Sequence, residues 1–281
     1  MKEYSNPKGL PVIVAGLPQS GSTLLYNIII GIISCRCNRK EIGMGDMNGI
    51  TSHELLTAVM ITNRPIVMKT HGLGLNSRIM LTDPKTKVFT TCRDLRDCVA
   101  SNLRKSEILK NDMINSCSSL DLSTNKDNSR SAISSLDDLK KLLSIDFSEE
   151  QWRLHRIKAL VCDNLHTYES WRDKSDYEFN YEKFKEASME SKISQIIHIA
   201  SVLNISLRPQ QAYDILHLVE VILPASAHET DTKPSEGNFL SQSHMTNHGK
   251  IKGYRNTLTD TEIQLIEDIA GDWLREKGYL T

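Results

Sequence analysis

Residues 11–23 contain glycine and hydroxyl side chains at the spacing of a phosphate-binding loop. An apolar β-branched run leads into Gly16, and a turn follows to Gly21 and then to Ser22 and Thr23. This strand–loop–helix arrangement points backbone N–H groups at a bound anion. In a nucleoside-triphosphatase loop, the pattern GxxxxGK[ST] places a lysine where this chain has Ser22. The spacing therefore predicts a site for a phosphate-like group and matches ATP hydrolysis poorly.

Other side chains that could do chemistry follow two further apolar runs. His71 lies two residues after Lys69, which ends one run, and Arg93 follows the second. A histidine can accept a proton near neutral pH, and a guanidinium can form paired hydrogen bonds with a phosphate. Ser101 lies eight residues after Arg93, two turns along an expected helix, so its hydroxyl can donate to the same group.

The elements that must position these residues alternate along the chain. Candidate strands are 11–16, 65–69, 86–92 and 177–181, and candidate helices are 22–34, 53–62, 95–106, 150–172, 189–203 and 260–276. Strands separated by helices predict an α/β fold with a central parallel β-sheet flanked by helices on both faces. Right-handed crossovers bring the strand ends to one edge of the sheet. We therefore expect the loop after Gly16, residues 69–71 and Arg93 to converge.

Length and composition are those of an ordinary globular domain. The chain has 281 residues, of which 39% are hydrophobic and 25% charged, and its formal net charge is −1. No global field favours nucleic acid or an anionic membrane, so an anionic ligand must be held by local clusters. The apolar run 24–35 is too short to span a bilayer. We predict one cytoplasmic domain over residues 1–281, with no stable membrane insertion and no nucleic-acid partner.

Cysteines and polar segments give weaker signals. The six cysteines form neither CxxC nor a zinc spacing, which is typical of reduced thiols in a cytosolic protein. Residues from about 111 to 150 begin with a stretch rich in Ser, Asn and Asp, and we interpret them as a mobile insertion. A second such stretch, about 223–250, carries Pro, Gly, Ser, Thr and His.

Four segments occur in an order that is informative in combination. They are Gly16-Leu-Pro-Gln-Ser-Gly-Ser-Thr23, Lys69-Thr-His71, Arg93 to Ser101, and His248-Gly249 through Tyr254-Arg255. Together they resemble the sulfotransferase family that uses 3′-phosphoadenosine 5′-phosphosulfate (PAPS). The first is similar to the family's PxSGTTW loop for the 5′-phosphosulfate, the second to its KTH segment, and the third to its RxxxDxxxS signature for the 3′-phosphate. Tyr181-Glu182 resembles the family's YED segment.

The resemblance implies a P-loop-like nucleotide-binding fold and an activity. The activity is transfer of a sulfuryl group from PAPS to a hydroxyl or amine acceptor, with 3′-phosphoadenosine 5′-phosphate (PAP) as product and no required metal. It implies that His71 is the general base, that Lys69 is a catalytic cation, and that residues 223–250 cover the cofactor. The implied cofactor-binding residues are Gln19, Ser20, Gly21, Ser22, Thr23, Leu24, Arg93, Ser101, Tyr181, His248, Gly249 and Lys250. Small molecules, sugars and lipids all remain open as acceptors.

The chain departs from the family pattern at three places. Gln19 stands where the family's loop lysine meets the leaving oxygen, and we predict that Lys69 takes over that role. Leu24 replaces a tryptophan that often stacks on adenine. Asn247 and His248, before Gly249, fall where the family has the arginine and lysine of its RKG segment, with Lys250 and Lys252 as nearby cations. Tyr181 has two open interpretations, an adenine contact or a core residue at a strand end.

Two other functions stay open on the residues alone. A P-loop kinase or triphosphatase is disfavoured by the missing lysine at position 22 and by the lack of an obvious magnesium-binding partner. A non-catalytic nucleotide-binding protein is supported by Gln19 and disfavoured by Lys69 and His71. We expect Arg96 and Arg104, unlike Arg93, to be solvated.

Overall fold

A five-stranded sheet forms the centre of the computed structural model, which describes residues 9–37, 42–46, 64–106, 148–223 and 250–281. The strands run in the order β2-β3-β1-β4-β5, and every neighbouring pair is parallel. In chain order they are Pro11–Gly16 (β1), Gly43–Asp46 (β2), Ile66–Lys69 (β3), Lys87–Cys92 (β4) and Tyr177–Asn180 (β5). The predicted parallel α/β sheet is confirmed.

Four strands lie within one residue of their predicted bounds, whereas β2 was not predicted. Its sequence is Gly-Met-Gly-Asp, and glycine and aspartate are depleted in strands. The central strand β1 is buried along its whole length. Val12 and Val14 face one hydrophobic cluster, and Ile13 and Ala15 face another, as the two-residue period of a strand requires.

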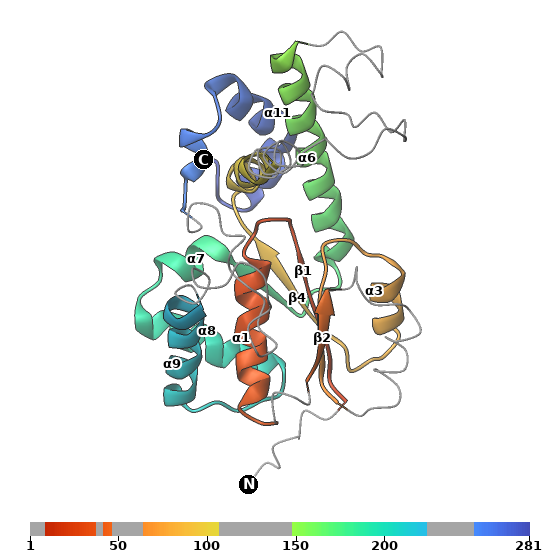
Figure 1. Ribbon diagram of the computed structural model, residues 1–281, viewed down its shortest axis with the longest axis vertical. Coiled ribbons are helices and arrows are strands. Elements are labelled where there is room, and N and C mark those ends of the chain that lie inside the picture. Colours follow the sequence, from red (N-terminus) through yellow and green to blue (C-terminus); the bar gives the residue numbers. More distant parts are fainter. Residues whose placement is uncertain (1–8, 38–41, 47–63, 107–147, 224–249) are drawn as a thin grey trace, which may run out of the picture.

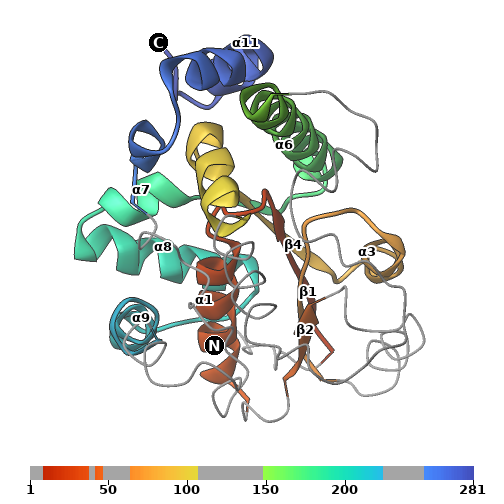
Figure 2. The ribbon, with the colours of Figure 1, turned by 45° about the horizontal axis from the view of Figure 1, so that its top comes forward.

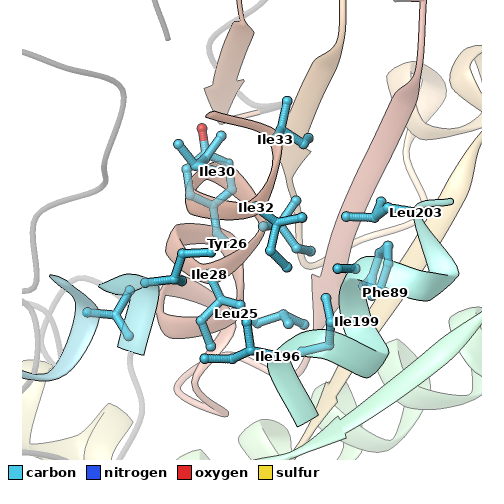
Figure 3. Packing of buried hydrophobic residues seen from close by; sticks show 14 of the residues in the cluster. Leu25, Tyr26, Ile28, Ile30, Ile32, Ile33, Phe89, Ile196, Ile199 and Leu203 are labelled. Atoms are coloured by element: carbon cyan, nitrogen blue, oxygen red, sulfur yellow. The ribbon is translucent and has the colours of Figure 1, made fainter. Parts of the chain in front are cut away.

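Helices cover both faces of the sheet (Figure 1). One face carries α1 (Ser22–Ser34), α8 (Met189–Val202) and α9 (Pro209–His217). Figure 3 shows Leu25 of α1 beside Ile196 of α8, both members of the cluster on this face. The other face is covered by α3 (Leu75–Met80) and by Trp171 near the end of α6 (Glu149–Arg172). Because α1 is apolar on nearly every side, it is buried on nearly every side.

A third layer lies beyond the carboxyl ends of the strands. It combines the helix over residues 95–106 with α6 and α11 (Asp260–Glu276), which pack around a separate cluster that includes Leu17 of the loop after β1 (Figure 2). Capping boxes at Ser148 and Thr259 fix the starts of α6 and α11. The predicted helices at 22–34, 95–106, 150–172, 189–203 and 260–276 are confirmed to within one residue.

Several predictions fall outside the described residues. These are the helix at 53–62, nearly all of the insertion at 111–150, and all but the two end residues of the loop at 223–250, so that His248 and Gly249 are outside. Among the described helices, none combines the length and the apolar character needed to cross a membrane.

Candidate functional site

The loop between β1 and α1 depends on two glycines with positive φ. Gly16 has φ 146°, and a Cβ there would lie 2.1 Å from Thr91 Oγ1. Gly21 has φ 89°, and a Cβ there would lie 2.4 Å from a ring carbon of Tyr181. Only glycine fits both the backbone conformation and the space. Gly21 is also the N-cap of α1 and supplies no capping side chain, so the helix N-terminus is suited to an anion.

Ser20 stabilises the inside of this loop. Its N–H and its hydroxyl both donate to the carbonyl oxygen of Leu17, at 3.2 and 2.5 Å. The hydroxyl also forms a short hydrogen bond with Thr91 Oγ1 of β4. Ser20 therefore shapes the loop against the sheet, and the preceding Gln19 takes the left-handed conformation, with φ 66°.

Lys69 reaches the start of α1 from the end of β3. It is aligned with Val14 in the sheet register, and its Nζ donates to Thr23 Oγ1 at 3.2 Å. The predicted convergence of residues 69–71 with the loop after β1 is therefore present. The contact with Thr23 places the Lys69 cation at the first turn of α1. The loop itself carries the uncharged Gln19.

His71 is held by contacts to two different elements. Its Nδ1 lies 2.8 Å from the carbonyl oxygen of Gly16, at the end of β1. Its own carbonyl oxygen accepts the indole N–H of Trp171 at 3.2 Å. Because a carbonyl oxygen can only accept, Nδ1 carries the proton, and in the neutral ring Nε2 is then the basic nitrogen. This tautomer is the one that a general base acting through Nε2 needs.

Arg93 is buried between the loop and the segment that begins at Lys250. Only 5% of it is exposed. Its Nη1 donates to the carbonyl oxygen of Gln19 at 2.9 Å, and its Nη2 donates to that of Lys250 at 3.2 Å. The guanidinium lies over the ring of Tyr181, 4.7 Å from the centroid. The Nε atom is buried and has no hydrogen-bond partner among the described residues.

Ser101 and Asp97 lie on the Arg93 side of the following helix, at spacings of four residues. Ser101 Oγ donates to Gln19 Oε1 at 3.3 Å, so the predicted phosphate donors Arg93 and Ser101 both contact Gln19. The Asp97 carboxylate accepts the backbone N–H groups of Lys252 and Tyr254, each at 2.8 Å. Burial raises the pKa of Asp97. This role of Asp97 was not predicted from the sequence, although the sequence does show Arg93, Asp97 and Ser101 spaced four residues apart.

The expectation that Arg96 and Arg104 are solvated is wrong. Arg96 is 6% exposed and binds the Asp94 carboxylate, Glu267 Oε1 at 2.6 Å and the carbonyl oxygen of Tyr279 at 2.8 Å. Arg104 is half-buried and donates to Thr257 Oγ1 at 2.5 Å. The C-terminal elements cover the helix at 95–106, which carries both arginines. The residues that make this contact lie more than 150 positions further along the sequence, so no local pattern predicts it.

Glu182, which is buried, and Tyr279, which is half-buried, form a hydrogen-bonded pair next to Arg93. Glu182 Oε1 accepts the backbone N–H of Asp94 at 3.0 Å, and Oε2 accepts the Tyr279 hydroxyl at 2.8 Å. Burial raises the pKa of Glu182. Tyr279 was missed because a residue 97 positions away in sequence gives no local signal.

The remaining predicted site residues lie in several environments. Leu24 lies on α1 and is buried in the core cluster on the face of the sheet that α1 covers. Ser22 is buried at the start of the same helix. Tyr181 begins α7 (Tyr181–Glu186) instead of ending β5 and is buried. Within the ranges that the structure covers, no cluster of three or more His, Cys, Asp or Glu side chains could hold a metal ion.

Comparisons with known proteins bear on the family and the fold. A family model described as "Sulfotransferase domain" matches residues 10–278. Among solved structures, mouse sulfotransferase SULT7A1 complexed with PAP has 12% identity and a TM-score of 0.54, covering 95% of this chain and 85% of that one. Retinol dehydratase complexed with androsterone and inactive cofactor PAP has 14% identity and a TM-score of 0.47, covering 96% and 82%. No curated protein matched the chain.

Proposed function

The chain belongs to the sulfotransferase domain family, and we propose that it transfers a sulfuryl group from PAPS to a hydroxyl acceptor with His71 as the general base. The observation that carries the proposal is the 2.8 Å contact between His71 Nδ1 and the carbonyl oxygen of Gly16. It fixes a basic Nε2 two residues after the end of β3, the strand that pairs with β1. Of the segments that resemble the family, those at 69–71 and 93–101 both contact the one at 16–23, which supports the proposal.

The side chains around the loop fit a nucleotide with two phosphate groups. Arg93 supplies a buried guanidinium whose Nε has no partner among the described residues, and Ser101 supplies a hydroxyl nearby. A guanidinium and a hydroxyl together suit a phosphate monoester such as the 3′-phosphate. The N-terminus of α1 with Thr23 suits the 5′-phosphosulfate. When bound, PAPS supplies the sulfuryl group and a phosphate leaving group.

His71 removes the proton in the proposed reaction. Nε2 accepts the proton of the acceptor hydroxyl as the oxygen forms its bond to sulfur, and the bond from sulfur to the phosphate oxygen breaks. General-base assistance of this kind contributes about 10²–10⁴-fold in rate. The carbonyl oxygen of Gly16 fixes the tautomer, and Trp171 holds the backbone of His71 through the indole N–H.

Lys69 neutralises the charge that develops on the leaving oxygen. Its Nζ already contacts Thr23 Oγ1 at 3.2 Å, which supports a cation at the start of α1. Gln19 can donate a hydrogen bond from its amide but carries no charge. A preorganised charged donor at a developing oxyanion is worth a few kcal/mol of barrier, about 2.7–4 kcal/mol for one donor. We therefore assign the family's loop-lysine role to Lys69.

A ligand titration followed by melting temperature tests the nucleotide. PAP and PAPS are expected to stabilise the protein, by about 2.7 kcal/mol when the ligand is at 100 times its Kd. ATP with Mg²⁺ is the comparison, since a P-loop kinase would prefer it. Stabilisation by ATP with Mg²⁺ and none by PAP would overturn the proposal. Transfer of labelled sulfuryl groups from PAPS to a panel of small-molecule alcohols, sugars and amines then identifies the acceptor.

A further inference from the structure

Tyr279 directs its side chain back into the molecule from the segment after α11. It is the residue directly after the stretch that the family model matches. The preceding Gly278 has φ 76°, and the Tyr279 N–H donates to the carbonyl oxygen of Leu274 at 2.8 Å. The Tyr279 ring stacks on Trp273 with centroids 6.0 Å apart. The turn and the stacking together fix where the hydroxyl lies.

The Tyr279 hydroxyl lies at the carboxyl end of β5, where it has three hydrogen-bond partners. It donates to Glu182 Oε2 at 2.8 Å and accepts from Asn180 Nδ2 at 3.1 Å. The third partner is the weaker Cys92 Sγ, 3.8 Å away. The backbone of Tyr279 is held as well, because its carbonyl oxygen accepts from Arg96 at 2.8 Å. The hydroxyl is therefore a fixed donor to one particular carboxylate oxygen.

The Glu182 carboxylate is close to Arg93 without forming a hydrogen bond to it. Glu182 Oε1 lies 4.0 Å from Arg93 Nε, and both side chains are about nine-tenths buried. Oε1 instead accepts the N–H of Asp94, and Oε2 accepts the Tyr279 hydroxyl. Arg93 Nε meanwhile has no partner among the described residues. The two carboxylate oxygens are thus directed to other donors.

We propose that Tyr279 is a positioning residue for the 3′-phosphate site: its hydroxyl keeps the Glu182 carboxylate from closing on the Arg93 guanidinium. A carboxylate and a guanidinium readily form a pair of parallel hydrogen bonds. Such a pair would occupy Arg93 and compete with a phosphate for it. The inference rests on the proposed function, since it assumes that Arg93 binds the 3′-phosphate of PAPS.

Titration calorimetry with PAP and with adenosine 5′-phosphate tests this role, because the two nucleotides differ in the 3′-phosphate. Tyr279→Phe keeps the ring on Trp273 and removes only the hydroxyl. We expect it to weaken PAP binding about three- to tenfold, the scale of one typical hydrogen bond, and to leave adenosine 5′-phosphate binding unchanged. The matched control is Tyr168→Phe, whose ring also packs on Trp273, with centroids 5.5 Å apart.

Glu182→Gln separates positioning from a structural contribution. The amide keeps an acceptor for the Asp94 N–H but removes the charge that competes for Arg93. We expect Glu182→Gln alone to bind PAP at least as tightly as the wild type. We also expect the double variant Tyr279→Phe/Glu182→Gln to regain the affinity that Tyr279→Phe loses. If Tyr279 had only a structural role, the double variant would be no better than Tyr279→Phe.

The outcomes distinguish this inference from the proposed function. A wild-type protein that does not bind PAP overturns the proposed function and the inference with it. A wild type that binds PAP, with Tyr279→Phe binding it equally well, overturns the inference alone. A loss of PAP affinity in Glu182→Gln also overturns it, whether or not Tyr279→Phe folds.

Discussion

Asp97 and Arg93 lie four residues apart, and Asp97 Oδ2 is 3.8 Å from Arg93 Nη2. A carboxylate next to a guanidinium opposes the binding of an anion to that guanidinium, so Asp97 must have a different role. The Asp97 carboxylate accepts hydrogen bonds from the backbone N–H groups of Lys252 and Tyr254, and this is its role. Arg93 in turn donates to the carbonyl oxygen of Lys250. The two side chains together fix residues 250–254 against the site.

Asp97→Ala is expected to destabilise the protein strongly. It leaves two backbone N–H groups without their acceptor, at a cost of about 1–3 kcal/mol each. We expect the free energy of unfolding to fall by about 2–6 kcal/mol, measured by urea denaturation. The control is Asp268→Ala, because Asp268 is exposed and its one hydrogen-bond partner among the described residues is Gln264 on its own helix. Equal effects of the two substitutions would contradict the role assigned to Asp97.

The pH dependence of stability reports on Glu182. In the folded protein, burial raises the pKa of Glu182 above the ordinary value of 4.5, which applies to the unfolded chain. At a pH between the unfolded and the folded pKa, the folded protein therefore binds more protons than the unfolded chain. The contribution of Glu182 to stability is then full below the unfolded pKa and is lost as pH rises through the folded pKa. We expect the stability of the wild type relative to Glu182→Gln to fall as pH rises from about 4. Urea denaturation of both proteins across this range measures it, and a rise instead would show a lowered pKa.

Lys69→Ala is expected to abolish sulfuryl transfer. The loss of a charged donor at the leaving oxygen predicts a decrease in kcat of about 10²–10³-fold. Gln19→Lys, which restores a cation to the loop, should leave transfer intact or raise it. Single-turnover transfer from PAPS measures both. An active Lys69→Ala enzyme would show that another group neutralises the leaving oxygen.

His71→Ala is expected to lower kcat by about 10²–10⁴-fold with little effect on PAP binding. The rate of the wild type should also fall on the acid side, because a protonated imidazole cannot accept a proton. His166→Ala is the control, since His166 is exposed on α6. Unchanged transfer by His71→Ala would assign the base to a different residue.

The sequence predicted the strand ends and the glycine loop after β1 because both are local patterns. Gly16, Lys69, His71 and Arg93 each lie at or just after the end of an apolar run, and parallel topology alone brings such ends to one edge. Contacts between distant segments could not be predicted in this way. The Tyr279–Glu182 hydrogen bond and the burial of Arg96 depend on how α11 packs on the helix at 95–106. The short strand β2 was not predicted because two of its four residues are glycine.

Gly21→Ala is expected to disrupt the loop and with it PAP binding. An alanine would have to adopt φ 89°, and its Cβ would lie 2.4 Å from the Tyr181 ring, which itself lies under Arg93. The strained backbone costs about 1–2 kcal/mol, and displacement of the ring adds to this. Gly74→Ala is the matched control, because Gly74 has φ −79° and a Cβ added there would meet no described atom within 4 Å beyond its chain neighbours. We expect the melting temperature and the PAP affinity to fall for Gly21→Ala and to stay unchanged for Gly74→Ala. A Gly21→Ala protein that binds PAP normally would show that the loop tolerates a side chain at position 21.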